Sequence, residues 1–546
     1  MSLFTTVISK IPKLNAFDLS FENLATMEFG EIVPISCKEV LPRDTFRQST
    51  EVVVKTAPML APVFSRIDLY LHYFFVPCRL LQSDWEDFIT TGVDGTQVNL
   101  TPPTATLQQI TTYGGATAIA DGSLQDYFNI PKITMSQITS ANIGSMKINM
   151  LPFLAYQKIY SDWYRDELLD SFEFEPLAGG AMTSANFGMA LTKRYRSWKK
   201  DYFTSARPNA QLGAPVSVPA TGFVSGDGPF IMNTATSVSA GSTQNLAIKG
   251  DDKDAGDTGY NYPLRAGNNY LYYINGLSVD NVGVDVNDLR RALKLQQWQE
   301  KNMRGGNRYI ENIFHHFGVK SSDARLQRSE LLGGRKIPVV ISEVTQTSAQ
   351  FDYANVEEGT TVYNPTTSLG QLAGKGGSVA NTGKVKWRAE EHGFIICLAS
   401  IMPKAAYMQG LPRMYWRKSY LDYAWPLFGN LGEQEIYKGE IYLAQSNPDG
   451  EFGYQSRYAD YKFSPNEVHG SFRSSMNYWH NDSIFDSAPS LNNNFVQLNG
   501  GQDDSTNDGQ NRIFPTLPDG YGHFYLHIFH DIKVLRALPK YGIPSI

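Results

Sequence analysis

Residues 65–89 read SRIDLYLHYFFVPCRLLQSDWEDFI, and this stretch decides the fold that the sequence predicts. From Ile67 to Phe75 apolar residues recur at every second position, as in a β-strand, and the positions between them are largely apolar or aromatic as well. A strand with two apolar faces is typical of one buried between two layers. Pro77 lacks the N–H that a sheet needs, so the strand ends there, and apolar residues then recur at helical spacing over 80–88.

Further strands are predicted on both sides of a long insertion, 92–336, in which loops alternate with helices. The early strands can be covered only if they share one sheet system with the late strands. This order predicts a mainly β fold: a jelly-roll β-sandwich with long loop and helical insertions, forming a single domain over 1–546 with an extended N-terminal arm over 1–30. The predicted strands outside the opening stretch are 31–35, 51–55, 337–347, 385–402, 439–444 and 522–535.

Helices and polar loops fill the rest of the chain. Helical spacing of apolar residues predicts helices over 153–172, 286–302 and 309–317. The segments 209–268, 357–382 and 490–512 are rich in Gly, Ser, Thr, Asn and Asp, which predicts loops. The first of these is so long that we expect it at the surface, because backbone without an apolar pattern is difficult to bury.

Composition limits the classes of protein that fit. The net charge of −6 and pI near 5.9 give no reason to expect a general nucleic-acid binder, so any such contact would be a local patch. The three cysteines, Cys37, Cys78 and Cys397, are far apart, which fits buried free thiols in a reducing compartment. The N-terminus lacks a signal-peptide pattern and no apolar run approaches 18 residues, so neither secretion nor a membrane span is expected.

No motif predicts a catalytic, cofactor or metal site. HExxH and GxSxG are absent, and the glycine-rich run at 370–376 is one residue short of a P-loop. His523 and His527 share one strand face but lie ~13 Å apart, too far to hold one ion alone. The run 504–509 imitates the start of an EF-hand but has Pro515 in place of the final Glu; acidic loops that gather calcium stay an open alternative to solvated turns.

The best signal for a partner is the basic–aromatic segment, residues 193–207, which reads KRYRSWKKDYFTSAR. Cations beside stacking rings are how proteins hold single-stranded nucleic acid without reading its sequence. The alternative is a segment that packs its rings inward and solvates its charges, or a subunit interface. The candidate nucleic-acid-binding residues are Arg194, Arg196, Lys199, Lys200 and Arg207.

Several motifs also resemble one known family, the major capsid protein of the small single-stranded DNA phages of the microvirus group, in its gokushovirus-like branch. They occur in the family's order and cover most of the chain. The polar segments 97–145, 209–268 and 490–512 match no pattern that we can place. The matching motifs are FGEIVP (29–34), EVLPRDTF (39–46), YFFVPCRLL (73–81), WEDF (85–88), KDYFTSARP (200–208), LRRA (289–292), RGGNRY (304–309), HFGV (316–319), FGYQSRYADYK (452–462) and GSFR (470–473).

The resemblance implies a jelly-roll subunit of the viral capsid type that builds a T=1 icosahedral shell around circular single-stranded DNA. It implies a virion protein assembled in the bacterial host cytoplasm with an internal scaffolding protein and a small basic DNA-binding protein. That last partner fits the acidic charge, because another chain could neutralise the genome. In the family a large insertion forms the protrusion at the threefold axis, and 209–268 is the candidate here.

A function from another class remains open at this point. Aromatic residues make up 12% of the chain and carboxylates are abundant, as in a β-sandwich carbohydrate-binding protein or a glycoside hydrolase. The absence of a secretion signal and the helices between the strands count against this alternative.

Overall fold

The computed structural model describes residues 13–92, 96, 99–213, 221–225, 278–283, 286–305, 309–318, 320, 322–345, 347, 350–354, 362–367, 372–498, 509–515 and 522–541. The chain divides into two compact units, residues 1–212 with 300–546, and residues 213–299. The first unit contains the large sheet. In the second, strand β9 (Thr221–Ser225) pairs antiparallel with β10 (Ser278–Gly283). Most of the predicted protrusion, 209–268, lies outside the described residues.

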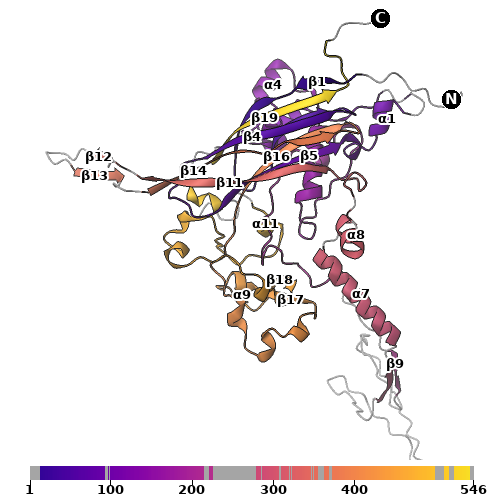
Figure 1. The fold of residues 1–546 in the computed structure, drawn as a ribbon, viewed down its shortest axis with the longest axis vertical. Helices are drawn as coiled ribbons and strands as arrows, with labels where there is room; N and C mark the ends of the chain where they lie inside the picture. The colour runs from indigo at the N-terminus through magenta and orange to yellow at the C-terminus, as the bar shows by residue number, and fades with distance from the viewer. Residues whose placement is uncertain are drawn as a thin grey trace, which may run out of the picture. The chain divides into compact units, whose positions relative to one another are not determined.

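The large sheet has ten strands, all paired antiparallel, and runs in the order β1-β19-β4-β14-β11-β5-β16-β3, with β2 also on β19 and β15 on β4 (Figure 1). Early and late strands therefore share one sheet, as predicted: β4 pairs with β19, and β5 pairs with β11 and β16. The strands are β1 (Asn15–Asp18), β2 (Phe21–Met27), β3 (Val33–Val40), β4 (Thr45–Thr56), β5 (Ile67–Pro77), β11 (Glu330–Thr345), β14 (Leu372–Asn381), β15 (Val385–Arg388), β16 (Gly393–Pro403) and β19 (Phe524–Arg536).

Strand β5 confirms the prediction from the opening stretch. It lies between β11 and β16, and nearly all of its residues are buried. Tyr73 faces the core enclosed by the sheet, and the next residue, Phe74, faces a second core on the other side. Two covered faces explain why its apolar pattern is continuous rather than alternating.

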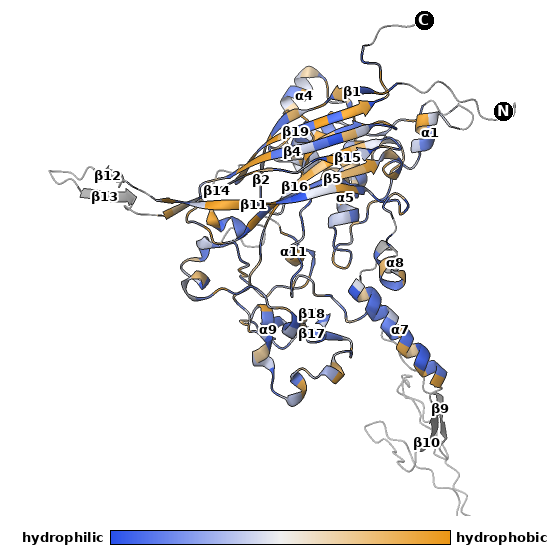
Figure 2. Cartoon of the chain, viewed as in Figure 1, coloured by the Kyte–Doolittle hydropathy of each residue, from blue (hydrophilic) through white to orange (hydrophobic). Residues whose placement is uncertain are grey.

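The sheet curls so that its two ends share one core. Met27 from β2 and Val33 and Ile35 from β3 pack in the same buried cluster, and the Asn23 side chain donates to the carbonyl oxygen of Ile35 at 2.8 Å. Buried and exposed residues alternate along most of β19, and hydrophobic and hydrophilic residues both occur along this strand (Figure 2). The fold is thus a mainly β curled antiparallel sheet with helical insertions, as the sequence predicts.

Short elements from the insertion cover the outer face of β5 and β16. Helix α5 (Leu151–Ile159) lies at their centre, and its fully buried Tyr156 donates to the carbonyl oxygen of Ile32 at 2.8 Å. The remaining elements here are η1 (Cys78–Leu80), α1 (Trp85–Thr90), β6 (Pro103–Thr106), α2 (Leu107–Thr111), η2 (Tyr113–Gly115), α3 (Leu124–Tyr127), α4 (Met135–Ala141), β7 (Lys147–Asn149), η3 (Tyr160–Tyr164), β8 (Gly180–Ala181) and α6 (Ser184–Leu191).

The helix predicted over 153–172 is shorter than expected. After α5 the chain makes one wider turn, η3, and then becomes extended at Arg165. Ser329 fixes this end, because its backbone N–H and hydroxyl both donate to the Asp162 carboxylate at 2.9 Å and its carbonyl oxygen accepts from the Trp163 indole at 3.0 Å. These long-range bonds outweigh the local helical preference.

Three other predictions are corrected. The sequence predicted an extended arm over 1–30, but β1 and β2 in this range are strands of the sheet that pair with β19. Residues 1–12 lie outside the described residues. Within the loop predicted over 357–382, β14 is a central strand of the sheet, and β13 (Val362–Thr367) pairs with β12 (Gln350–Ala354). The strand predicted over 439–444 is a helical turn, α9 (Lys438–Ile441), capped when the Glu440 carboxylate accepts from the Tyr437 N–H at 2.9 Å.

Predictions for the later helices hold. Helices α7 (Val286–Gly305) and α8 (Tyr309–Phe317) have the expected ranges within a few residues. The C-terminal half adds a hairpin and several short turns (Figure 1), and some of them enclose a separate small core that includes Ile436, Ile441 and Phe452. These elements are η4 (Arg413–Trp416), η5 (Tyr420–Asp422), η6 (Pro426–Phe428), β17 (Glu433–Tyr437), β18 (Glu451–Ser456), α10 (Ala459–Lys462), η7 (Gly470–Arg473), η8 (Asn477–Trp479), α11 (Asn493–Val496) and η9 (Gly509–Ile513).

Candidate functional site

The basic–aromatic segment, residues 193–207, lies within the first unit, with single β-bridges at Tyr195, Ser197 and Arg207 and a turn over 202–205. Its backbone bonds two other segments: the Arg196 N–H donates to the carbonyl oxygen of Gly30 at 2.7 Å, and the Trp198 N–H donates to that of Val496 at 2.8 Å. Trp198, Tyr202 and Phe203 are all buried. These rings therefore serve the protein core and offer no platform on which a base could stack.

Arg194 is fixed inside the subunit. Its guanidinium lies 3.9 Å from the centre of the Phe172 ring and 5.0 Å from that of Tyr160. Its Nε donates at 2.7 Å to the side-chain oxygen of Gln157, which is fully buried. Burial lowers the pKa of Arg194. Such a guanidinium, stacked and hydrogen-bonded, contributes to packing rather than to an open surface.

Arg196 and Arg207 are fixed in the same way. The Arg196 guanidinium lies 4.1 Å from the centre of the Tyr70 ring and donates to the Ser400 hydroxyl at 2.8 Å. Arg207 donates to the carbonyl oxygen of Arg304 at 2.7 Å and forms an ion pair with Glu433 at 3.7 Å. Three of the five predicted DNA contacts are thus committed to contacts within the subunit.

The two lysines differ from the three arginines because both are exposed. Lys200 forms an ion pair with Asp166 and donates to the carbonyl oxygen of Thr204 at 3.1 Å. Within the described ranges, Lys199 has no ion-pair partner. The segment therefore presents Lys199 and Lys200 to solvent, whereas its three arginines make contacts within the subunit.

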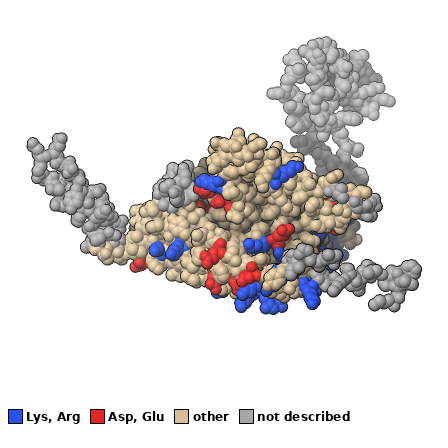
Figure 3. All heavy atoms as spheres, turned by 90° about the horizontal axis from the view of Figure 1, so that it is seen from above, with Lys and Arg blue, Asp and Glu red and all other residues tan. Residues whose placement is uncertain are grey.

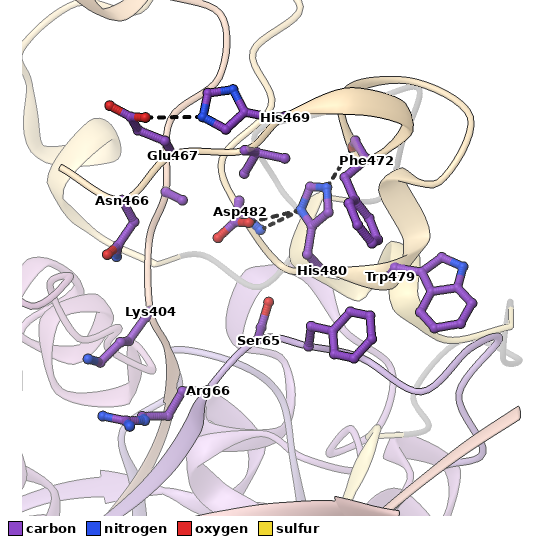
Figure 4. Close-up of a pocket in the computed structure, with 13 residues that line it drawn as sticks. Ser65, Arg66, Lys404, Asn466, Glu467, His469, Phe472, Trp479, His480 and Asp482 are labelled. Atoms are coloured by element: carbon purple, nitrogen blue, oxygen red, sulfur yellow. Dashed lines mark hydrogen bonds and ion pairs between the residues drawn. The ribbon is translucent and has the colours of Figure 1, made fainter. Parts of the chain in front are cut away.

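A cleft of about 330 Å³ carries cations that the sequence did not indicate (Figure 4). Arg66 and Lys404 lie together on one side of it, and neither has an ion-pair partner among the residues that the structure describes. On another side the exposed Phe64 ring stacks on Trp479 at 5.5 Å. A cation pair beside an exposed aromatic ring can bind a phosphate and stack a base.

The sheet topology explains why these two cations meet. Ile67 at the start of β5 pairs with Pro403 at the end of β16, so the preceding Arg66 and the following Lys404 are neighbours. The Lys404 N–H donates to the carbonyl oxygen of Arg66 at 3.1 Å. The sequence predicted both strands but not their pairing. Knowing that β5 pairs with β16 would have placed Arg66 beside Lys404.

The acidic groups of the cleft are paired with its histidines. The Glu467 carboxylate lies 3.1 Å from His469, and the Asp482 carboxylate lies 3.1 Å from His480 (Figure 4). In the described part of the chain, no group of three or more His, Cys, Asp or Glu side chains could hold a metal ion. The calcium candidate at 504–509 lies almost entirely outside the described residues.

Basic side chains do not form a broad surface on the face seen in Figure 3. There Lys and Arg are interspersed with Asp and Glu, and most of the surface carries neither. The cations available to a polyanion on that face are therefore local, in keeping with the overall charge of −6.

Comparison with known proteins identifies the family of this chain. The family described as "Capsid protein (F protein)" matches residues 6–546. The chain belongs to this phage capsid protein family.

Three relatives of this chain are each described as "Capsid protein VP1". The chain is 32% identical to "Capsid protein VP1" of Bdellovibrio phage phiMH2K, over 97% of this chain and 95% of that protein. It is 30% identical to "Capsid protein VP1" of Chlamydia phage 1, over 100% and 97%, and 28% identical to that of Spiroplasma virus 4, over 87% and 86%. The resemblance to gokushovirus-like capsid proteins is therefore confirmed.

The capsid protein is a structural component of a phage virion, not an enzyme, because its relatives are structural capsid proteins. The carbohydrate-active alternative is not favoured. None of the described helices has the length and apolar character needed to cross a lipid bilayer.

Proposed function

We propose that this chain is the major capsid protein of a T=1 icosahedral shell that encloses a circular single-stranded DNA genome. The observation that carries the proposal is the family match over residues 6–546, because it covers both the curled sheet and its insertions. A closed shell needs heterologous contacts around its fivefold and threefold axes. The long insertions, with 209–268 as the protrusion at the threefold axis, are the segments that we assign to those contacts and to the outer surface.

Two further proteins belong to this proposal: an internal scaffolding protein and a small basic DNA-binding protein. The charge of the chain supports the second of these. The chain has a net charge of −6, and three arginines of its most basic segment are occupied within the subunit. A packaged genome needs many compensating cations, so a separate basic chain would supply most of them.

We assign the direct DNA contacts of this chain to the cations that remain accessible. These are the lysine pair Lys199 and Lys200 and the cleft pair Arg66 and Lys404. The exposed Phe64 ring beside the cleft pair would stack a base without selecting its identity. Arg194, Arg196 and Arg207 support this surface by packing.

The test is co-expression of the chain with its scaffolding and DNA-binding partners, followed by sedimentation and measurement of nuclease-resistant DNA. We expect closed particles that protect single-stranded DNA. Double variants, Lys199→Gln with Lys200→Gln or Arg66→Gln with Lys404→Gln, should form particles that protect less DNA. Lys132→Gln, a change at an exposed lysine in the outer insertion, serves as the control. Failure of the unchanged chain to form any particle would overturn the proposed shell function. An unchanged amount of nuclease-resistant DNA in both double variants would overturn the assigned DNA contacts.

A further inference from the structure

The turns between β16 and β17 expose an unusual amount of apolar side chain. They form the short helical turns η4, η5 and η6 near α9 (Figure 1). Leu427 is 84% exposed and Tyr420 is 72% exposed. We name the following set the aromatic–leucine patch: Met414, Tyr415, Tyr420, Leu421, Tyr423, Trp425, Leu427 and Leu431.

Two arginines of the same turns point the other way, into the subunit, whereas Lys418 and Asp422 are exposed. Arg413 donates to the buried Glu440 carboxylate at 2.7 Å and lies 4.0 Å from the centre of the Tyr437 ring. Arg417 forms an ion pair with Asp460, and both side chains are 12% exposed. The exposed apolar side chains of these turns outnumber the two exposed charges, and so large an exposed apolar set predicts that another protein covers the patch.

The patch is held in a fixed shape by local hydrogen bonds. The Trp425 indole donates to the carbonyl oxygen of Tyr420 at 2.8 Å. The Asp422 carboxylate accepts from the N–H groups of Lys418 and Ser419 at 2.8 and 2.7 Å, and these bonds lower its pKa. A surface organised before binding loses less conformational entropy when a partner arrives.

The size of the patch matches a stable protein interface. Its four aromatic members are each 48–72% exposed, and aromatic side chains of roughly 200 Å² at that exposure leave on the order of 450 Å² open. Its four aliphatic members add on the order of 250 Å². Their summed exposed area approaches the ~800 Å² that each partner buries in a standard interface.

We propose that the aromatic–leucine patch docks on a second copy of this chain and is a subunit interface of the shell. This proposal rests on the proposed function. Exposed Tyr, Trp and Met are typical of an interface core, whereas a nucleic-acid surface needs more cations than the one exposed lysine of these turns, Lys418. A shell subunit meets more copies of its own chain than of any other partner, so the second copy is the occupant that we assign.

The first test identifies the occupant directly. A photo-cross-linking amino acid is placed at position 427 of the otherwise unchanged chain and activated in assembled particles. We expect a cross-linked product of twice 61.0 kDa, with both peptides from this chain. A product with the scaffolding or DNA-binding protein alone, or no product, would overturn the proposal. If the unchanged chain formed no particles, the shell function would fail instead, so the two failures are distinguishable.

A second test measures the contribution to assembly. Leu427→Asp should lower the yield of particles about tenfold or more, because a carboxylate would be buried at the centre of the contact. The matched control is Leu24→Asp, since Leu24 is 78% exposed on strand β2, outside the patch. Both variants should keep the melting temperature of the unassembled subunit. An equal effect of both variants on assembly would show that the patch has no special role.

Discussion

Arg194 offers the sharpest test of how the basic–aromatic segment works. Arg194→Met keeps most of the side-chain volume but removes the guanidinium from above Phe172 and from the 2.7 Å bond to Gln157. A partly desolvated cation–π contact contributes about 1–2 kcal/mol, and a hydrogen bond to a charged group roughly 1.5–3 kcal/mol. Because such contributions overlap, we expect the free energy of unfolding to fall by about 3 kcal/mol.

The assay is guanidinium-induced unfolding of the unassembled subunit, followed by tryptophan fluorescence. Lys199→Met is the matched control, because Lys199 is exposed and a surface change of this kind is expected to stay within ~0.5 kcal/mol of the wild type. Only the lysine variant should reduce packaged DNA without affecting stability. If Arg194→Met were as stable as the wild type but packaged less DNA, Arg194 would contact the genome and the packing account would be refuted.

Two other predictions concern the sheet and its response to acid. Gly374→Ala should destabilise β14 by about 2–3 kcal/mol, since a Cβ there would lie 2.5 Å from the carbonyl oxygen of Ala61; Gly377→Ala, with 3.5 Å to its nearest neighbour, should cost little. Burial, and then the Arg196 charge, lower the pKa of His72 to about 4. The unfolded chain, whose histidines titrate near ~6.5, binds that proton first, so stability should be full above pH ~6.5 and fall toward pH 4. His72→Gln should weaken this dependence in acid-unfolding curves, and the exposed His469→Gln should not; equal profiles for both would contradict the assignment.

Much of the sheet could be predicted because its apolar patterns are long. The runs that became β5, β16 and β19 each extend over 11 residues or more, so local pattern and final structure agree. Strand β14 escaped prediction because its glycines resemble a loop. Gly374 and Gly376 are needed where neighbouring segments approach closely, since a Cβ at the latter would lie 2.6 Å from the Thr56 side chain.

The candidate site was less accessible to prediction than the fold. The basic–aromatic segment is visible in sequence, but its role depends on partners such as Phe172 and Tyr70, which no local pattern connects to it. The cleft cations Arg66 and Lys404 are more than 300 residues apart in sequence and meet only because β5 pairs with β16. Long-range strand pairing, not local chemistry, decides which charges remain free.

Whether this chain builds a T=1 shell is tested most directly by cryo-electron microscopy of particles purified after co-expression with the scaffolding and DNA-binding partners. We expect closed icosahedral particles with one copy of this chain, and its curled sheet, in each icosahedral asymmetric unit. Only small soluble species, or shells with several copies in each asymmetric unit, would contradict it.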